Sequence, residues 1–107
     1  MRITDLARGT ENSNIEDLRR MVGSDKHRPG PAYGRLVKEQ VPVWAIIGYV
    51  KAIMEATGSL SITEDVVGRV AVDYDIHPEA VLAALLYYEE HRNAIDALLE
   101  ENAATIT

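Results

Sequence analysis

The stretch SITEDVVGRVAVDYDIHPEAVLAALLYYEEH, residues 61–91, decides the fold, because it predicts two helices and the turn between them. Ser61 and Glu64 have the spacing of a capping box, which begins a helix whose apolar residues recur on one face. Pro78 is favoured at the first position of a helix, and the helix that it begins is predicted to run to about Asn102. Two helices joined by about three residues are typical of a helix-turn-helix.

The preceding segment predicts a third helix, over residues 42–57. Its apolar residues follow the i, i+3, i+4, i+7 series, and Gly58 is placed to end the helix in the left-handed conformation. We prefer Pro42 at the first helical position; a short extended segment or small hairpin over residues 35–43 is the alternative. The predicted fold class is mainly α: a compact helix-turn-helix (homeodomain-like) three-helix core with a short N-terminal extended segment or small hairpin.

The sequence before this core predicts an N-terminal arm and linker. Ser13 and Glu16 form another capping box, for a helix of about two turns that ends at Gly23. Residues 23–31 combine glycine, proline and charged residues, a composition that favours a loop. The predicted organisation is an N-terminal arm and linker over residues 1–34, a helical domain over residues 35–102 and a C-terminal tail over residues 103–107.

Composition and charge narrow the classes of function. The 107 residues fit one domain, and the absence of cysteine excludes disulfide frameworks and thiolate catalysis. No apolar run is long enough to cross a bilayer, and the first residues do not form a signal peptide, so we expect a cytoplasmic protein with no membrane contact. Residues 1–40 carry a net charge of +2 and residues 41–107 a net charge of −8. Nucleic-acid contacts are therefore expected mainly from the first third of the chain.

The last predicted helix carries Leu82 and Leu86 one turn apart on its polar face. Leaving a leucine in water forgoes about 1.5–3 kcal/mol of burial free energy. We therefore predict that Leu82, Leu86 and Tyr87 form a dimer or partner interface, so that the chain is a homodimer or binds another protein. Leucines that are simply exposed are the alternative, since single exposed leucines are common.

The same helix tests whether the chain reads DNA. In a DNA-binding helix-turn-helix, the outer N-terminal residues of the second helix meet base edges in the major groove. Here those residues lack any side chain that can donate a hydrogen bond to guanine; they are Glu79, Leu82, Ala83 and Leu86. The sequence therefore gives only weak support to DNA as a partner.

The basic residues of the first third are the remaining candidates for phosphate or partner contacts: Arg19, Arg20, Lys26, Arg28 and Arg35. An ordinary solvated surface is the alternative interpretation of these charges. Asp73, Asp75 and His77 alternate at a helix end, where such residues serve as caps more often than as metal ligands. With no Gly-rich phosphate loop and no nucleophile motif, we predict no catalytic residue, no metal and no cofactor.

Three groups of residues in the helical part follow a known order: Val41-Pro42-Val43-Trp44-Ala45-Ile46, Asp73-Tyr74-Asp75-Ile76-His77-Pro78-Glu79-Ala80-Val81 and Tyr87-Tyr88-Glu89-Glu90-His91. They resemble the domain-of-unknown-function 433 family, small prokaryotic proteins regarded as VapB-like antitoxins. The resemblance spans residues 34–101 and departs from the family at Lys38-Glu39-Gln40, where its members usually have a Gly-Thr-Arg-like turn. It implies a homeodomain-like helix-turn-helix core, frequent dimerisation and pairing with a PIN-like ribonuclease toxin.

We therefore expect a non-enzymatic, antitoxin-like interaction protein that binds and neutralises a PIN-like ribonuclease toxin, as a dimer. It would cover the active site or the cationic RNA-binding groove of the toxin with its acidic surface or with residues 1–34. The alternative is a stand-alone helix-turn-helix DNA-binding transcriptional regulator, whose binding to DNA would be sensitive to salt.

Overall fold

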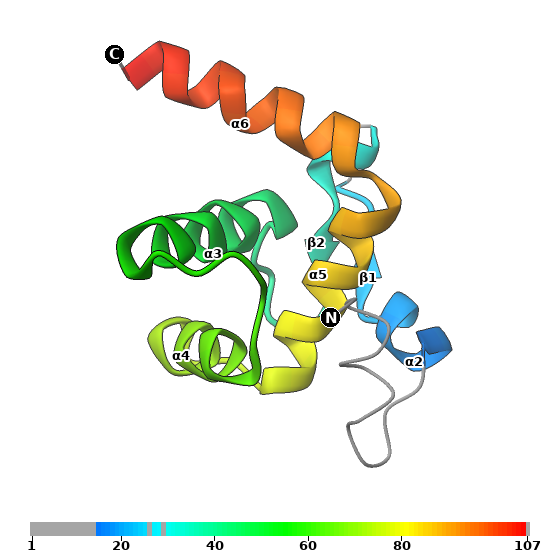
Figure 1. The fold of residues 1–107 in the computed structure, drawn as a ribbon. Coiled ribbons are helices and arrows are strands. Elements are labelled where there is room, and N and C mark those ends of the chain that lie inside the picture. The colour runs from blue at the N-terminus through cyan, green and yellow to red at the C-terminus, as the bar shows by residue number, and fades with distance from the viewer. Residues whose placement is uncertain (1–14, 26, 29, 107) are drawn as a thin grey trace.

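The computed structural model describes residues 15–25, 27, 28 and 30–106. Within these residues the protein is mainly helical, with one small antiparallel sheet (Figure 1). In chain order the elements are α2 (Ile15–Arg20), β1 (Val22–Gly23), the 3-10 helix η1 (Pro31–Tyr33), β2 (Arg35–Leu36), α3 (Val43–Thr57), α4 (Glu64–Tyr74), α5 (Pro78–Glu90) and α6 (Arg92–Ile106). No helix in this part of the chain combines the length and the apolar character needed to span a membrane.

Helix α5 is the centre of the core. It contacts α2, β1 and β2 as well as α3, α4 and α6, and Figure 1 shows it between α2 on one side and α3 with α4 on the other. Every residue from 80 to 86 is buried. A helix that is apolar on all sides is a buried helix, so the apolar run in the sequence reflects a central position in the fold.

The caps of α3 and α4 explain where these helices begin and end. Gly58 ends α3 in the left-handed conformation, with a φ of 70°, as predicted. Pro42 precedes α3 with a ψ of 137°, so the prediction that it is the first helical residue is wrong. Thr63, rather than the predicted Ser61, caps α4, because its side chain accepts a hydrogen bond from the Val66 N–H.

The turn between α4 and α5 has the length that the sequence predicts. Asp75 adopts a left-handed conformation, with a φ of 55°, and its N–H donates to the carbonyl oxygen of Val72. Asp is among the residues that tolerate this conformation best. His77 caps α5 through Nδ1, which accepts from the Glu79 N–H, and Pro78 is the first helical residue. The helix-turn-helix spacing is therefore present.

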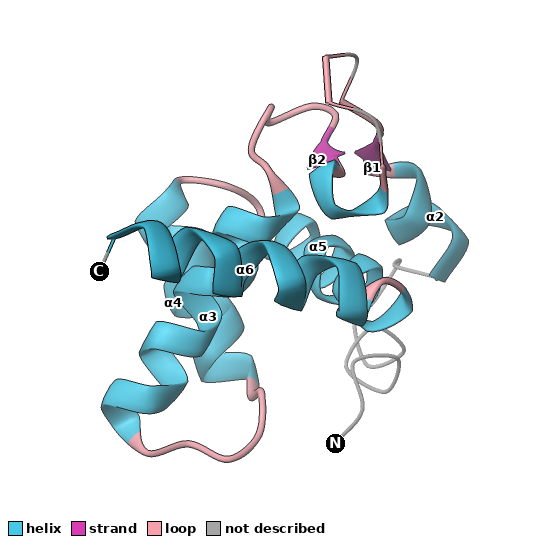
Figure 2. Cartoon of the chain, turned by 90° about the horizontal axis from the view of Figure 1, so that it is seen from above, coloured by secondary structure: helices cyan, strands magenta, loops and turns pink. Residues whose placement is uncertain are grey.

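The long helix predicted over residues 78–102 is wrong, because it is divided in two. His91 leaves the helical conformation, with a φ of −130° and a ψ of 35°, and α6 begins at Arg92. The change of direction lets α6 pack across α3 and η1 as well as α5, and Figure 2 shows α6 lying across α5 from above. Ile95 becomes fully buried there, so tertiary packing outweighs the continuous helical pattern.

The described part of the predicted N-terminal arm packs on the helical core. Helix α2 contacts α5, and Leu18 is fully buried. Strand β1 pairs with β2 in antiparallel register, Val22 opposite Leu36 and Gly23 opposite Arg35, so the predicted boundary at residue 34 falls between the two strands of one sheet. The predicted helix end at Gly23 is also wrong, because α2 ends at Arg20 and Gly23 belongs to β1. The predicted cap Ser13 and residues 1–14 as a whole lie outside the described residues.

A tight turn follows β2 and brings residues 35 and 36 beside residues 41 and 42. This arrangement is a shorter form of the small hairpin that the sequence offered over residues 35–43. The Leu36 N–H donates to the Val41 carbonyl oxygen at 2.8 Å, and Arg35 forms an isolated antiparallel bridge with Pro42. Gln40, in the turn, has a φ of 60°. The extended segment that the sequence offered as the alternative for residues 35–43 is therefore present in part.

Candidate functional site

A groove of about 600 Å³ opens between α3, the loop that follows it, and α5. Its lining is mainly apolar, from Ile47, Val50, Met54, Leu60, Ile62 and Leu85, and its polar members are Lys51, Ser61, Tyr88, Glu89 and Arg92. A concave, largely apolar site with a few convergent polar groups is the usual form of a binding site. This groove is therefore the first candidate functional site.

A hydrogen-bonded network fixes one wall of the groove. The Lys51 Nζ and the Tyr88 hydroxyl both donate to Oδ1 of Asp96, each at 2.7 Å. The Lys51 Nζ also lies 5.2 Å from the centre of the Tyr88 ring, and the Arg92 Cζ lies 5.4 Å from the same ring centre. The network joins α3, α5 and α6, so it holds Tyr88 and its two neighbouring cations in place.

The protonation of this network is stable near neutral pH. Partial burial raises the pKa of the Asp96 carboxyl, but the hydrogen bonds from Lys51 and Tyr88 outweigh burial and hold that pKa below its ordinary value. Burial lowers the pKa of Lys51, and its hydrogen bonds with Asp96 and Tyr88 reverse that effect and raise it. Asp96 is therefore a carboxylate and Lys51 an ammonium ion, which suits a binding wall rather than proton transfer.

The mouth of the groove carries an exposed leucine. Leu60 lies in the loop between α3 and α4 and is 99% exposed, although it lines the same groove as buried residues such as Leu85. Val72, on α4, is 78% exposed and Val37 is 52% exposed, and neither residue lines the groove. An exposed leucine that adjoins an open apolar groove is a surface that another molecule can cover.

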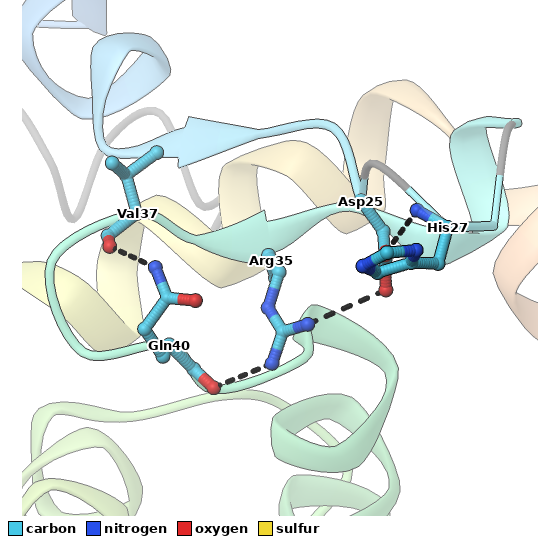
Figure 3. Close-up of polar contacts among 5 residues, drawn as sticks. All are labelled: Asp25, His27, Arg35, Val37 and Gln40. Carbon is cyan, nitrogen blue, oxygen red and sulfur yellow. Dashed lines mark hydrogen bonds and ion pairs between the residues drawn. The ribbon is translucent and has the colours of Figure 1, made fainter.

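A second hollow lies beside the β1–β2 sheet, and Figure 3 shows three of the residues that line it, Asp25, His27 and Arg35. Arg35 projects between Asp25 and the turn at Gln40. Its Nη1 lies 3.3 Å from Asp25 Oδ2, and its Nη2 donates to the Gln40 carbonyl oxygen at 2.8 Å. Asp25 in turn accepts from the His27 N–H at 2.8 Å, and this hydrogen bond lowers the pKa of its carboxyl.

The predicted interface residues do not form a surface. Leu82 and Leu86 are 5% and 3% exposed, so the prediction that they face solvent is wrong. The reason is that α2 and the β1–β2 sheet pack on α5, together with α3, α4 and α6. Tyr87 donates its hydroxyl to the Pro31 carbonyl oxygen at 2.6 Å. A homodimer stays a prediction, without the surface that suggested it.

The predicted basic residues are distributed over two regions. Arg19 pairs with Glu90 and Arg20 with Asp17, both from α2. Arg28 and Arg35 line the second hollow together, and the Arg28 Cζ lies 5.7 Å above the centre of the Tyr33 ring. Lys26 lies outside the described residues. The structure therefore brings two of the five predicted cations to one site.

Sequence reasoning missed the groove residues Lys51, Leu60 and Tyr88. The signal that could have found Leu60 is its place as an apolar residue in the polar connector Gly58-Ser59-Leu60-Ser61. Lys51 and Tyr88 carry no such signal, because their role depends on the packing of α3 against α5 and α6. Among the residues that the structure describes, no three His, Asp or Glu side chains come together as a metal site.

Comparison of the chain with models of protein families, with curated proteins and with solved structures found no match.

Proposed function

We propose that the chain is a non-enzymatic, antitoxin-like protein that binds a PIN-like ribonuclease and neutralises it through the groove between α3 and α5. The observation that carries the proposal is the groove itself, with its apolar floor, its fixed wall at Tyr88 and the exposed Leu60 at its mouth. An apolar side chain of a partner that covered Leu60 and entered the groove would gain about 1.5–3 kcal/mol of burial free energy.

The charge of the helical part supports a ribonuclease as the partner. Residues 41–107 carry eleven Asp or Glu and three Lys or Arg, and no charged side chain of the described residues is buried. A ribonuclease has to bind a polyanion, so its RNA-binding surface is positively charged. Complementary charge accelerates the encounter of two proteins and selects against wrong partners.

The arrangement of the helices supports the homeodomain-like core that the family resemblance implies. Helices α3, α4 and α5 each contact the other two. Two of the resembling segments lie at the ends of these helices, since Val41-Pro42 directly precedes α3 and residues 75–77 form the turn between α4 and α5. A core of three mutually packed helices is what the resemblance implies, and the ribonuclease partner is likewise inferred from the resemblance.

The burial of α5 weighs against the DNA-binding regulator. A recognition helix has to present its outer N-terminal face to the major groove. In this protein residues 80–86 are covered by the chain's own elements, and Leu82 and Leu86 lie within the core. Reading DNA with α5 would therefore require α2 and the sheet to separate from it.

The proposal is tested by co-expression with a PIN-like coding sequence adjacent to the gene for this chain. The ribonuclease is induced alone and together with this protein, and growth and intact cellular RNA are measured. We expect growth arrest with the ribonuclease alone, restored growth with both, and co-purification of the two proteins. Continued RNA cleavage and arrest in the presence of excess folded protein would overturn the proposal.

A further inference from the structure

The second hollow brings aromatic rings and cations together on the face that carries the β1–β2 sheet. Its volume is about 340 Å³, and its lining includes Tyr33 and Trp44 beside Arg28, Arg35 and His27. Tyr33 and Trp44 are half-buried, whereas His27 and Arg28 are exposed. A hollow that combines aromatic faces with guanidinium groups has the two elements that proteins use to bind a nucleotide, stacking for the base and charge for the phosphate.

Asp25 is the acidic member of the hollow, and its charge is already neutralised. Its carboxylate faces the Arg35 guanidinium at 3.3 Å and accepts the His27 N–H (Figure 3). Asp25 therefore positions Arg35 and the His27 backbone. Arg28 is left without an ion pair among the described residues, and its guanidinium lies on Tyr33 at the edge of the hollow.

Two destabilising features occur at or next to this hollow, and neither contributes to the stability of the fold. Arg35 Nε is buried and has no hydrogen-bond acceptor among the described residues, and a buried donor without an acceptor is destabilising. Gln40, whose carbonyl oxygen accepts from Arg35, is a non-glycine residue at a φ of 60°. Gln40 itself lies outside this hollow, but Arg35 lines it and donates to the Gln40 carbonyl oxygen, so both features adjoin the hollow. Strained backbone and unsatisfied polar groups concentrate at functional sites.

We propose that this hollow binds a single nucleotide unit, with the base against Trp44 and Tyr33 and the phosphate against Arg28, next to the Arg35–Asp25 pair. A guanidinium group matches two phosphate oxygens at once, and Arg28 is exposed and can leave the Tyr33 ring to make that contact. The nucleotide is either free or part of a single strand of RNA. The proposal does not depend on the ribonuclease partner, because the groove between α3 and α5 is lined by different residues.

Trp44 provides the measurement, since it is the only tryptophan of the chain and lines the hollow. Its fluorescence is titrated with adenosine monophosphate and with a 5′-phosphorylated oligoadenylate at constant ionic strength. We expect saturable quenching by at least one of the two, and binding about tenfold weaker for the Arg28→Glu variant. Arg20→Glu, which makes the same change of charge on α2 outside the hollow, is the control and should change the affinity less than about twofold.

The comparison of the two ligands distinguishes the source of the nucleotide. Equal affinities indicate a free nucleotide, and much tighter binding of the oligoadenylate indicates a single strand; either result supports the site. The proposal is overturned if neither ligand quenches Trp44 saturably, or if adenosine binds as tightly as its monophosphate. It is also overturned if the two arginine variants lose affinity equally, or if a glutamate-rich peptide displaces the nucleotide at lower concentration, which would indicate an acidic protein partner.

Discussion

Arg19 of α2 and Glu90 at the end of α5 form an ion pair, with 2.8 Å between Nη2 and Oε2, although 71 positions separate them in the sequence. The pair joins the first described helix to the last turn of the central one. The two side chains are 55% and 36% exposed, and ion pairs in contact with solvent contribute little to stability. The free energy that holds α2 in place therefore comes mainly from apolar packing, above all of Leu18, which is fully buried one position before Arg19.

Replacing Leu18 with alanine tests whether α2 belongs to the core. We expect Leu18→Ala to lower the free energy of unfolding by about 2–5 kcal/mol, the range for removing a buried leucine side chain. Arg19→Ala is the matched control, with a much smaller effect because the ion pair is exposed to solvent. Urea unfolding of both variants measures the difference. Equal stabilities of the two variants would mean that α2 does not contribute to the core.

Two glycines should respond to alanine in opposite directions. A Cβ at Gly34 would lie 2.5 Å from the Tyr87 Cζ, and Tyr87 is held by its hydrogen bond to Pro31, so we expect Gly34→Ala to destabilise the protein by about 1–3 kcal/mol. A Cβ at Gly68, within α4, meets nothing within 4 Å. Gly68→Ala should therefore stabilise the protein by about 0.5–1 kcal/mol through helix propensity. Thermal unfolding of both variants measures whether each substitution lowers or raises the stability. A stabilising Gly34→Ala would contradict the close packing of Tyr87.

The Asp96 carboxylate predicts a loss of stability in acid. Its hydrogen bonds with Lys51 and Tyr88 hold its pKa below the ordinary value of 3.8, against the opposing effect of burial. A depressed pKa contributes stability that is present above pH 3.8 and lost as the pH falls through the folded-state value. We expect the stability difference between the wild-type protein and Asp96→Asn to be constant near neutral pH and to shrink below pH 3.8. A difference that does not change with pH would contradict the ionic network.

The helical half of the fold could be predicted from the sequence, because its signals are local. Periodic apolar residues, Gly58 and Pro78 place α3 and the start of α5 to within a residue or two. The break at His91 carries no glycine or proline signal and depends on packing of α6 against α3. Likewise the residues around Leu82 and Leu86 do not indicate which segment covers them, because α2 is distant in the sequence and contacts α5 only in the folded chain.

The candidate sites were harder to predict for the same reason. The groove is made by α3, a loop and α5, and its mouth depends on one residue, Leu60, in a connector. The sequence did single out Arg28 and Arg35 as phosphate or partner contacts, and the structure adds that they line one hollow with Tyr33 and Trp44. Charge is visible in a sequence, whereas the aromatic partners of a charge depend on the fold.

The central claim, that the groove between α3 and α5 neutralises a ribonuclease, is tested most directly by RNA cleavage in vitro. Cleavage by the PIN-like partner is measured against increasing amounts of the wild-type protein, Leu60→Asp and Val72→Asp. Both variants place a carboxylate at an exposed aliphatic position, and only Leu60 lines the groove. We predict that wild type and Val72→Asp inhibit equally and that Leu60→Asp needs at least about a tenfold higher concentration, the equivalent of about 1.4 kcal/mol of lost binding free energy. Inhibition by Leu60→Asp at the wild-type concentration would contradict the claim.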